Sequence, residues 1–180
     1  MTCIIGYGDG RNAYIGADSF LGHSGFSGTL GPQEKIIKHK NLLIGFSGSM
    51  RFGQVVREYL PSLKKHKSHL SDQRYLTKHL IEPLRRLLKD KDGSGSEAKI
   101  GGEYGSAIVA YRGSVYNIDI DYQLSKLATP YNIIGSGYQY AFGAMAALES
   151  LPPKKRIFKS LEISAKFSPF VQGPFYVEKL

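Results

Sequence analysis

The chain opens with Thr2-Cys3-Ile4-Ile5-Gly6-Tyr7, and Ala13-Tyr14-Ile15-Gly16-Ala17 follows a short interval later. Gly8-Asp9-Gly10-Arg11-Asn12 separates these two apolar runs, and residues of these types favour a tight turn. Two short apolar runs joined by such a turn predict a β-hairpin. The chain is therefore expected to begin as antiparallel sheet.

Further along the chain, the hydrophobic period changes from that of a strand to that of a helix and back. The expected strands are 35–39, 41–46, 106–111, 114–119, 133–134 and 175–178. The expected helices have apolar stripes over 52–63, 75–88, 138–148 and about 154–166. Ser49 and Ser71 or Asp72 are candidate N-caps, and Pro83 is expected to kink the second helix. The Gly-, Ser- and charge-rich segment 91–105 is expected to be a mobile loop.

This order of elements predicts the fold. Strands, two helices, strands, two helices and a final strand can bury two sheets against each other, with helices on the outer faces. We therefore expect an α+β protein, a four-layer αββα sandwich of two antiparallel sheets. The length of 180 residues favours a single domain over 1–180.

Composition restricts the class of protein. Hydrophobic residues make up 42% and charged residues 22% of the chain, as in ordinary globular proteins. The one cysteine, Cys3, cannot form an internal disulfide, which favours a buried thiol in a reducing compartment. No apolar segment approaches the length of about 18 residues that a membrane span needs, and no leader pattern opens the chain. A cytoplasmic protein without a membrane partner is expected.

The formal net charge of +9 raises the question of a nucleic-acid partner. Much of this charge is local, in a cluster over 64–69 and in a second cluster over 85–91 that closes a predicted helix. Cations at the C-terminal end of a helix are favourable to its dipole. The sequence has neither zinc-finger spacing nor an RNP-like aromatic motif, so a solvated basic face is the favoured interpretation over nucleic-acid binding.

Several segments together carry a family resemblance. They are Thr2-Cys3-Ile4-Ile5-Gly6, Gly16-Ala17-Asp18-Ser19, Lys35-Ile36, Ile44-Gly45-Phe46-Ser47-Gly48, Ile134-Gly135-Ser136-Gly137 and Phe175-Tyr176-Val177-Glu178. In this order and spacing the chain resembles the proteasome β-type subunits, in particular the bacterial HslV peptidase and its small relatives. These proteins are N-terminal nucleophile hydrolases of the threonine peptidase class, with the αββα fold. The resemblance covers nearly the whole length.

Thr2 is the candidate nucleophile. If Met1 is removed, Thr2 supplies both a hydroxyl and a free α-amine. An α-amine has an ordinary pKa of about 7.7–8.0, which suits a base at neutral pH. The resemblance implies that Lys35 stands beside this hydroxyl and that Asp18 holds Lys35. The spacing between the two is one residue longer than in the family, which suggests an insertion within 22–31 and leaves Lys38 as an alternative.

Three further residues complete the implied catalytic set. Gly45 is expected to present its backbone N–H to the oxyanion, and Ser136 to hydrogen-bond the terminal amine. Where the family usually has an aspartate after the last helix, this sequence has Lys166-Phe167-Ser168-Pro169. Ser168 is expected to orient the same network through its hydroxyl, although it cannot supply a charge.

The expected activity is hydrolysis of peptides or unfolded proteins through an acyl-enzyme, with no cofactor and no metal. The residues near Phe20, Leu21, Phe46 and Ser47 are the candidate substrate-binding pocket. The resemblance implies a homo-oligomeric ring and an ATP-driven unfoldase as a further partner. The alternative is a catalytically silent, proteasome-like structural or interaction subunit that retains Met1, and it is motivated by Met1, Lys166 and Ser168.

Overall fold

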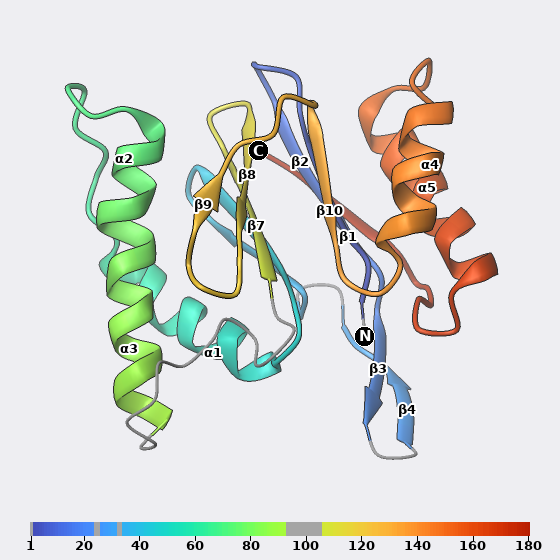
Figure 1. Ribbon diagram of the computed structural model, residues 1–180, viewed down its shortest axis with the longest axis horizontal. Helices are drawn as coiled ribbons and strands as arrows, with labels where there is room; N and C mark the ends of the chain where they lie inside the picture. Colours follow the sequence, from blue (N-terminus) through green and yellow to red (C-terminus); the bar gives the residue numbers. More distant parts are fainter. Residues whose placement is uncertain (1, 24–25, 32–33, 93–105) are drawn as a thin grey trace.

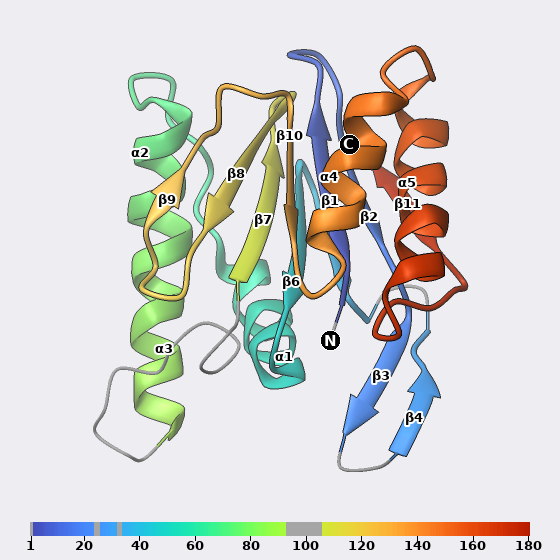
Figure 2. The same ribbon diagram turned by 45° about the vertical axis from the view of Figure 1, so that its right-hand side comes forward.

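A computed structural model describes residues 2–23, 26–31, 34–92 and 106–180. The predicted four-layer αββα sandwich is confirmed (Figures 1 and 2). One outer layer holds α1 to α3, the two antiparallel sheets follow, and α4 and α5 form the other outer layer. The segment 93–105, most of the predicted mobile loop, lies outside the described residues. None of the described helices is long and apolar enough to cross a membrane.

The first sheet contains the predicted N-terminal hairpin. Its strand order is β10-β1-β2-β11, with every neighbouring pair antiparallel. The strands span Ile4–Gly8 (β1), Ala13–Ala17 (β2), Tyr131–Ile134 (β10) and Tyr176–Lys179 (β11). Because β1 and β2 are antiparallel neighbours, residues just before β1 and just after β2 are brought to the same end of the sheet.

The second sheet has the strand order β5-β6-β7-β8-β9. Its strands span Ile36–His39 (β5), Leu42–Ser47 (β6), Ser106–Tyr111 (β7), Ser114–Ile118 (β8) and Leu124–Ser125 (β9). A separate two-stranded ribbon is formed by Phe20–His23 (β3) and Phe26–Thr29 (β4). This ribbon was not expected from the Gly- and Ser-rich segment 22–31, whose side chains give little strand signal.

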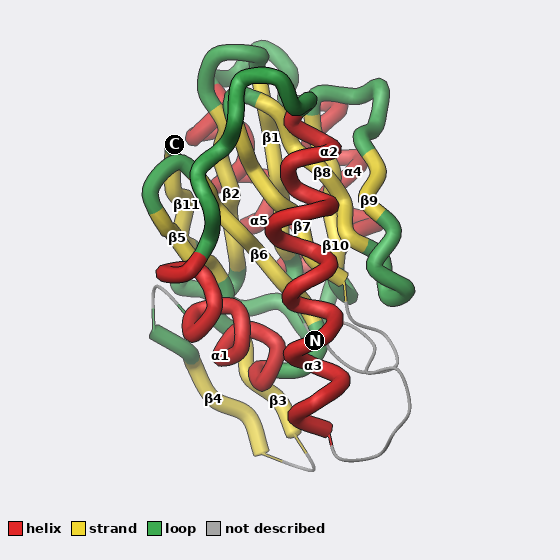
Figure 3. The backbone as a smooth tube through the Cα atoms, turned by 90° about the vertical axis from the view of Figure 1, so that its left-hand side faces the viewer, coloured by secondary structure: helices red, strands yellow, loops and turns green. Residues whose placement is uncertain are grey.

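The helical layer over the second sheet contains α1 (Met50–Tyr59), α2 (Asp72–Leu76) and α3 (Glu82–Asp92), which Figure 3 shows in front of the strands. Ser49 and Ser71 cap α1 and α2, as predicted: their hydroxyls accept from the N–H groups of Arg51 and Arg74. A 3₁₀ turn, Leu60–Ser62, follows α1, and a π-helical turn, Thr77–Ile81, joins α2 to α3.

Pro83 accounts for the irregular backbone before α3. Proline has no N–H to offer the carbonyl four residues earlier, which here belongs to His79. The phenol of Tyr59 donates a hydrogen bond to that carbonyl instead. The predicted disturbance at Pro83 is therefore compensated by a side chain from α1.

The opposite outer layer is a helix pair, α4 (Tyr138–Ala147) and α5 (Pro153–Phe167), packed on the first sheet. Buried apolar side chains fill all three interfaces of the sandwich. Both sheets are consequently buried on both faces, so residues in their central strands that face opposite ways are equally inaccessible to solvent. As a result, residues of β6 that were predicted at the active site, such as Gly45 and Phe46, are buried between layers.

Candidate active site

Thr2 lies two residues before the start of β1 and is only 4% exposed. Its backbone N–H donates to the hydroxyl of Ser136 over 3.1 Å, and its carbonyl accepts from that hydroxyl and from the Gly137 N–H, each over 3.3 Å. The loop between β10 and α4 therefore holds Thr2 through both of its backbone polar groups. Sequence reasoning predicted the contact between Ser136 and the Thr2 nitrogen, and the structure brings the two together.

Gly135 makes this close approach possible. A Cβ at this position would lie 2.3 Å from the carbonyl oxygen of Thr2, and the glycine has a φ of +90°. Any larger residue meets both obstacles, because L-residues rarely adopt positive φ and backbone atoms cannot move away as a flexible side chain can. Gly135 is therefore required by the close contact between this loop and the backbone of Thr2.

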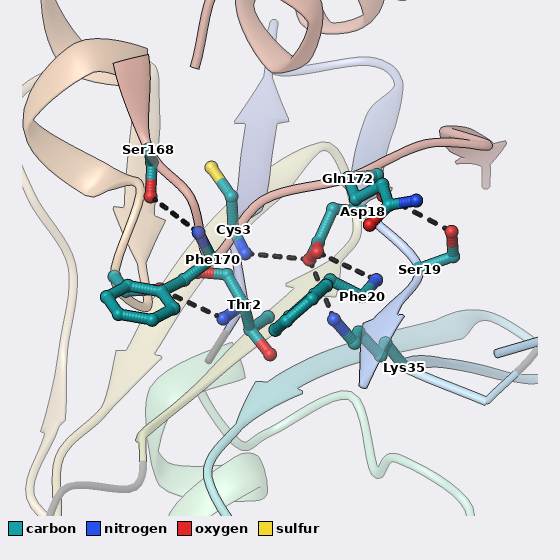
Figure 4. Close-up of polar contacts among 10 residues, drawn as sticks. Thr2, Cys3, Asp18, Ser19, Phe20, Lys35, Ser168, Phe170 and Gln172 are labelled. Carbon is teal, nitrogen blue, oxygen red and sulfur yellow. Dashed lines mark hydrogen bonds and ion pairs between the residues drawn. The ribbon is translucent and has the colours of Figure 1, made fainter. Parts of the chain in front are cut away.

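Asp18 follows β2 and is almost fully buried, with 1% exposure. Its Oδ1 accepts hydrogen bonds from the Cys3 N–H and from the Lys35 ammonium, each over 2.8 Å, and its Oδ2 accepts from the Phe20 N–H over 3.0 Å. Figure 4 shows the carboxylate between the Cys3 amide and the Lys35 ammonium. Because both donors reach one oxygen, the ammonium lies next to the backbone that carries Thr2.

Lys35, just before β5, is the buried cation of this pair, with 5% exposure. Burial lowers the pKa of the Lys35 ammonium, and the charge and hydrogen bond of Asp18 oppose that shift. The alternative residue, Lys38, is half exposed and pairs with Glu178 at 3.7 Å. The geometry thus favours Lys35 over Lys38.

Cys3, the residue after Thr2, also has a side chain that can act as a nucleophile, but its surroundings make it unreactive. The thiol is completely buried, as the sequence predicted. Burial, and then the negative charge of Asp18, raises the pKa of Cys3 to about 12. A protonated, inaccessible thiol is a poor nucleophile at neutral pH. Figure 4 shows the Cys3 sulfur on the opposite side of the backbone from the Thr2 hydroxyl.

Gly45 does not fit the predicted role of oxyanion donor. It lies within β6, paired with Ile36 of β5 on one side and with Ile108 of β7 on the other. The Phe46 N–H donates to the Lys35 carbonyl, so the alternation of an antiparallel ladder turns the Gly45 N–H toward Ile108. A Cβ on Gly45 would lie 2.6 Å from Ile4 Cγ2 and 2.8 Å from Ile15 Cγ2. Gly45 thus allows the two sheets to approach each other.

Gly48 is the residue that sequence reasoning missed. It is exposed, directly follows β6 and has a φ of +94°. Its N–H lies two positions after that of Phe46, so the same alternation aims it toward the side of β6 on which Lys35 lies. The sequence feature that could have identified Gly48 is its position between the end of an apolar strand and the Ser49 helix cap, where the chain must turn sharply.

The four residues predicted near the substrate pocket do not share one environment, because two are buried and two are partly exposed. Phe46 is 1% exposed and packs edge-on against Phe52 of α1, with ring centroids 5.6 Å apart, so it belongs to the core and not to a pocket. Ser47 is also buried, and its hydroxyl contacts that of Ser106 at 3.3 Å. Phe20 and Leu21 are partly exposed at the start of β3, directly beyond Asp18. Of the four predicted residues, only these two remain candidates for contact with a substrate.

Ser168 ends α5 and is buried, but its hydroxyl is used locally. Its hydroxyl accepts from the Phe170 N–H over 3.4 Å (Figure 4). The Ser168 carbonyl accepts from the Val171 N–H. The hydrogen bonds of Ser168 to described residues all stay between Ser164 and Val171. Its predicted direct part in the Thr2 network is therefore not observed; it shapes the turn that follows α5. Across the described parts of the chain, no cluster of three His, Cys, Asp or Glu side chains could hold a metal ion.

The solved structures that resemble this chain share its complete fold. The Thiobacillus denitrificans protein BPH superposes with a TM-score of 0.80 at 20% identity, over 100% of this chain and 97% of that one, and has also been solved in complex with epoxomicin. HslV from Trypanosoma brucei gives a TM-score of 0.72 at 20% identity, covering 99% of this chain and 98% of that one. Anbu, an ancestral β-subunit from Yersinia bercovieri, gives 0.69 at 13% identity, covering 99% and 81%.

Neither a protein-family sequence model nor a curated protein sequence matches the chain. The family resemblance is therefore supported by the comparison of structures. At 13–20% identity, these solved structures show that the fold is shared. The chain has the fold of the HslV- and proteasome-like N-terminal nucleophile hydrolases.

Proposed function

We propose that this protein is an N-terminal threonine peptidase that hydrolyses peptide bonds in peptides or unfolded proteins. The observation that carries the proposal is the convergence of two arrangements on Thr2. Ser136 binds its backbone nitrogen, and a buried ammonium shares the Asp18 oxygen with the next residue of the chain. A nitrogen base, a hydroxyl and a fixed positive charge are then available within one small region.

The proposed reaction has two steps. The Thr2 hydroxyl attacks the scissile carbonyl, its proton passes to the Thr2 α-amine, and that proton is delivered to the departing amine as the peptide C–N bond breaks. This leaves an ester between Thr2 and the acyl part of the substrate. A water molecule then attacks the ester, gives up its proton by way of the same amine, and releases the acid and the free enzyme.

The α-amine exists only after Met1 has been removed. While Met1 is attached, the Thr2 nitrogen is an amide with no useful basicity. Threonine is small enough to permit methionine removal by an ordinary aminopeptidase. The active form of the protein is therefore proposed to begin at Thr2.

Lys35 and Asp18 are proposed to act electrostatically. A positive charge favours the alkoxide that develops on Thr2, and Asp18 offsets the cost of burying that charge. For the oxyanion of the tetrahedral intermediate, we assign the donor to the backbone N–H of Gly48 in place of Gly45. Loss of one such donor typically costs about 2.7–4 kcal/mol in the transition state.

We further propose that the chain works in a homo-oligomeric ring in the cytoplasm and receives unfolded substrates from an ATP-driven unfoldase. The likeness to an HslV and to BPH supports this assembly. Phe20 and Leu21, which are partly exposed at the entrance to β3, are the proposed contacts for apolar substrate side chains.

A silent structural subunit is the second candidate. Two observations favour it: the hydroxyl of Ser168 is engaged with Phe170, and Lys166 stands close to the position where the family usually has a carboxylate. Such a subunit would keep Met1 and would use the same fold only for assembly.

Intact-mass measurement of the protein purified from its native host separates the two candidates. The peptidase must lack Met1, and after treatment with epoxomicin its mass must rise by one inhibitor molecule, located on Thr2 by peptide mapping. A chain that keeps Met1 throughout, forms no adduct and hydrolyses no unfolded protein would support the silent subunit and reject the peptidase.

A further inference from the structure

The end of the sandwich opposite Thr2 carries a basic hollow of about 380 Å³. Figures 1 and 2 both place the turns between β1 and β2 and between β7 and β8 at the opposite end from the start of the chain. Five cationic side chains line the hollow: Arg11, Lys38, Lys40, Arg112 and Lys179. They are spread over the chain from its first turn to its last strand, so the sequence alone does not reveal that they gather there.

The backbone that carries these cations is fixed by hydrogen bonds. The Gly10 N–H donates to the Gly113 carbonyl over 2.9 Å, which joins the turn bearing Arg11 to the turn bearing Arg112. The Leu180 N–H donates to the Ala13 carbonyl over 2.9 Å and anchors the end of β11. The Lys38 ammonium donates to the Lys179 carbonyl over 2.8 Å. The protein backbone around the hollow is thus ordered before any ligand binds, so binding does not carry the entropic cost of ordering it.

The charges around the hollow are only partly balanced. Arg112 pairs with Asp72 at 3.0 Å, and Lys38 lies 3.7 Å from Glu178. Within the described part of the chain, Arg11, Lys40 and Lys179 form no ion pair with an aspartate or glutamate side chain. Lys179 interacts only at longer range with the Asp9 carboxylate, whose pKa is lowered mainly by backbone hydrogen bonds and to a lesser extent by this lysine. Like charges held close together repel one another, so this arrangement favours the arrival of an anion.

A second hollow, of about 240 Å³, extends the first one. The two share Lys40 and Asn41 in their walls, and Lys64 and Lys65 line the second. The basic cluster over 64–69, first noticed in the sequence, therefore continues the cationic surface of the first hollow. The combined surface is elongated and suits a ligand with several negative groups in a row.

We propose that the basic hollow binds an oligophosphate anion, a chain of three or more linked phosphate groups. Arginine and lysine are the side chains that recognise phosphate oxygens in proteins. A nucleic acid is disfavoured because no aromatic side chain among the described residues lines the first hollow. Tyr75, which lines the second hollow, is only 3% exposed and its ring is already stacked on His66, so it offers bases little surface on which to stack. The site does not depend on the proposed peptidase activity, because it lies at the other end of the molecule.

Calorimetric titration of the purified protein with tripolyphosphate and with a longer linear polyphosphate tests the proposal, at several salt concentrations. The hollow variant combines Arg11→Gln, Lys40→Asn and Lys179→Gln; asparagine is chosen because Lys40 has a φ of +51°. The control variant, Arg51→Gln with Lys78→Gln and Lys159→Gln, removes the same charge from exposed positions on three other helical segments. Thermal unfolding of each variant checks that it is folded.

We expect the hollow variant to bind polyphosphate at least tenfold more weakly, while the control stays within about twofold of the parent chain. Removal of each phosphate-binding cation should reduce the slope of log K against log salt by roughly 0.7–0.9. If the two variants lose the same amount of polyphosphate affinity, the loss comes from the lower net charge and not from the hollow, and the proposal is overturned. Tighter binding of a single-stranded oligonucleotide with the same number of phosphates would also overturn it, in favour of nucleic acid. If the triple variant does not fold, Lys40→Asn alone must still weaken binding more than Lys78→Gln does.

Discussion

The hydroxyl of Ser136 lies 3.1 Å from the backbone nitrogen of Thr2 and 3.3 Å from its carbonyl oxygen. Two residues 134 positions apart in the chain are thereby joined at the point where β1 begins. If Thr2 is the nucleophile of a chain without Met1, as proposed, it needs such a clamp, because terminal residues are otherwise poorly ordered. The clamp and the buried Asp18–Lys35 pair together define where chemistry could occur.

Gly135→Ala should displace Thr2. The new methyl group would meet the Thr2 carbonyl oxygen in a backbone conformation that alanine disfavours, and we expect a loss of about 2–5 kcal/mol in the free energy of unfolding. Gly10→Ala is the matched control, since Gly10 has a φ of +87° but nothing within 4 Å of its Cβ position. The control should lose only about 1–2 kcal/mol. Urea unfolding measures both, and equal losses would argue against a clamp at Gly135.

Asp18→Asn should leave the Lys35 ammonium buried without its counter-charge. Removing one partner of a buried ion pair typically destabilises a protein by about 3–5 kcal/mol. The double variant Asp18→Asn with Lys35→Met removes both charges, and we expect it to be more stable than Asp18→Asn alone. Neither variant should hydrolyse peptides. A double variant less stable than the single one in urea unfolding would contradict the proposed electrostatic relation.

Gly45→Ala should reduce stability because its methyl group would press on Ile4 and Ile15, with a loss of about 1–3 kcal/mol. Adding Ile4→Ala makes room, so the double variant should lose less than the sum of the two single changes. Urea unfolding of the four proteins in this cycle measures the coupling. Unchanged stability together with a large fall in hydrolysis would restore Gly45 to the oxyanion role.

The Cys3 thiol should make folding stability depend on alkaline pH. Because burial raises the pKa of Cys3 to about 12, the folded state keeps a proton that the unfolded state has lost above pH 9.0. Stability is therefore lost as the pH rises from about 9 toward 12, by at most about 1.4 kcal/mol per pH unit from this group. Cys3→Ala should have a shallower decline than the parent chain when both are unfolded in urea at about pH 8, 9 and 10, which span the start of this range. Parallel declines would count against a perturbed thiol.

Much of the architecture follows from the sequence, because the hydrophobic period distinguishes the strands around Ile4, Ile15, Leu43 and Ile108 from the amphipathic helices. The segment over 22–31 could not be predicted as a ribbon, since glycine and serine leave no alternation to detect. The family motifs Gly16-Ala17-Asp18-Ser19 and Lys35-Ile36 did point to Asp18 and Lys35, whose contact the structure contains, although the spacing between them left Lys38 as an alternative.

The remaining site residues were less predictable for a physical reason. In the inner layers of a four-layer sandwich both faces of a strand are buried, so alternation does not tell which face meets a helix and which meets the other sheet. Phe46 faces the layer of helices α1 to α3, and Gly45 faces the other sheet. Sequence reasoning placed both residues at the active site. The direction of the Ser168 hydroxyl depends on how the chain turns after α5, which no local pattern specifies.

Hydrolysis of an unfolded protein by the Met1-free chain, compared among the parent, Thr2→Ser and Thr2→Ala, is the most direct test of the central claim. If Thr2 is the nucleophile, Thr2→Ser keeps partial activity because a hydroxyl remains beside the α-amine, and Thr2→Ala loses activity completely while remaining folded. Persistence of hydrolysis in a folded Thr2→Ala chain would contradict the account.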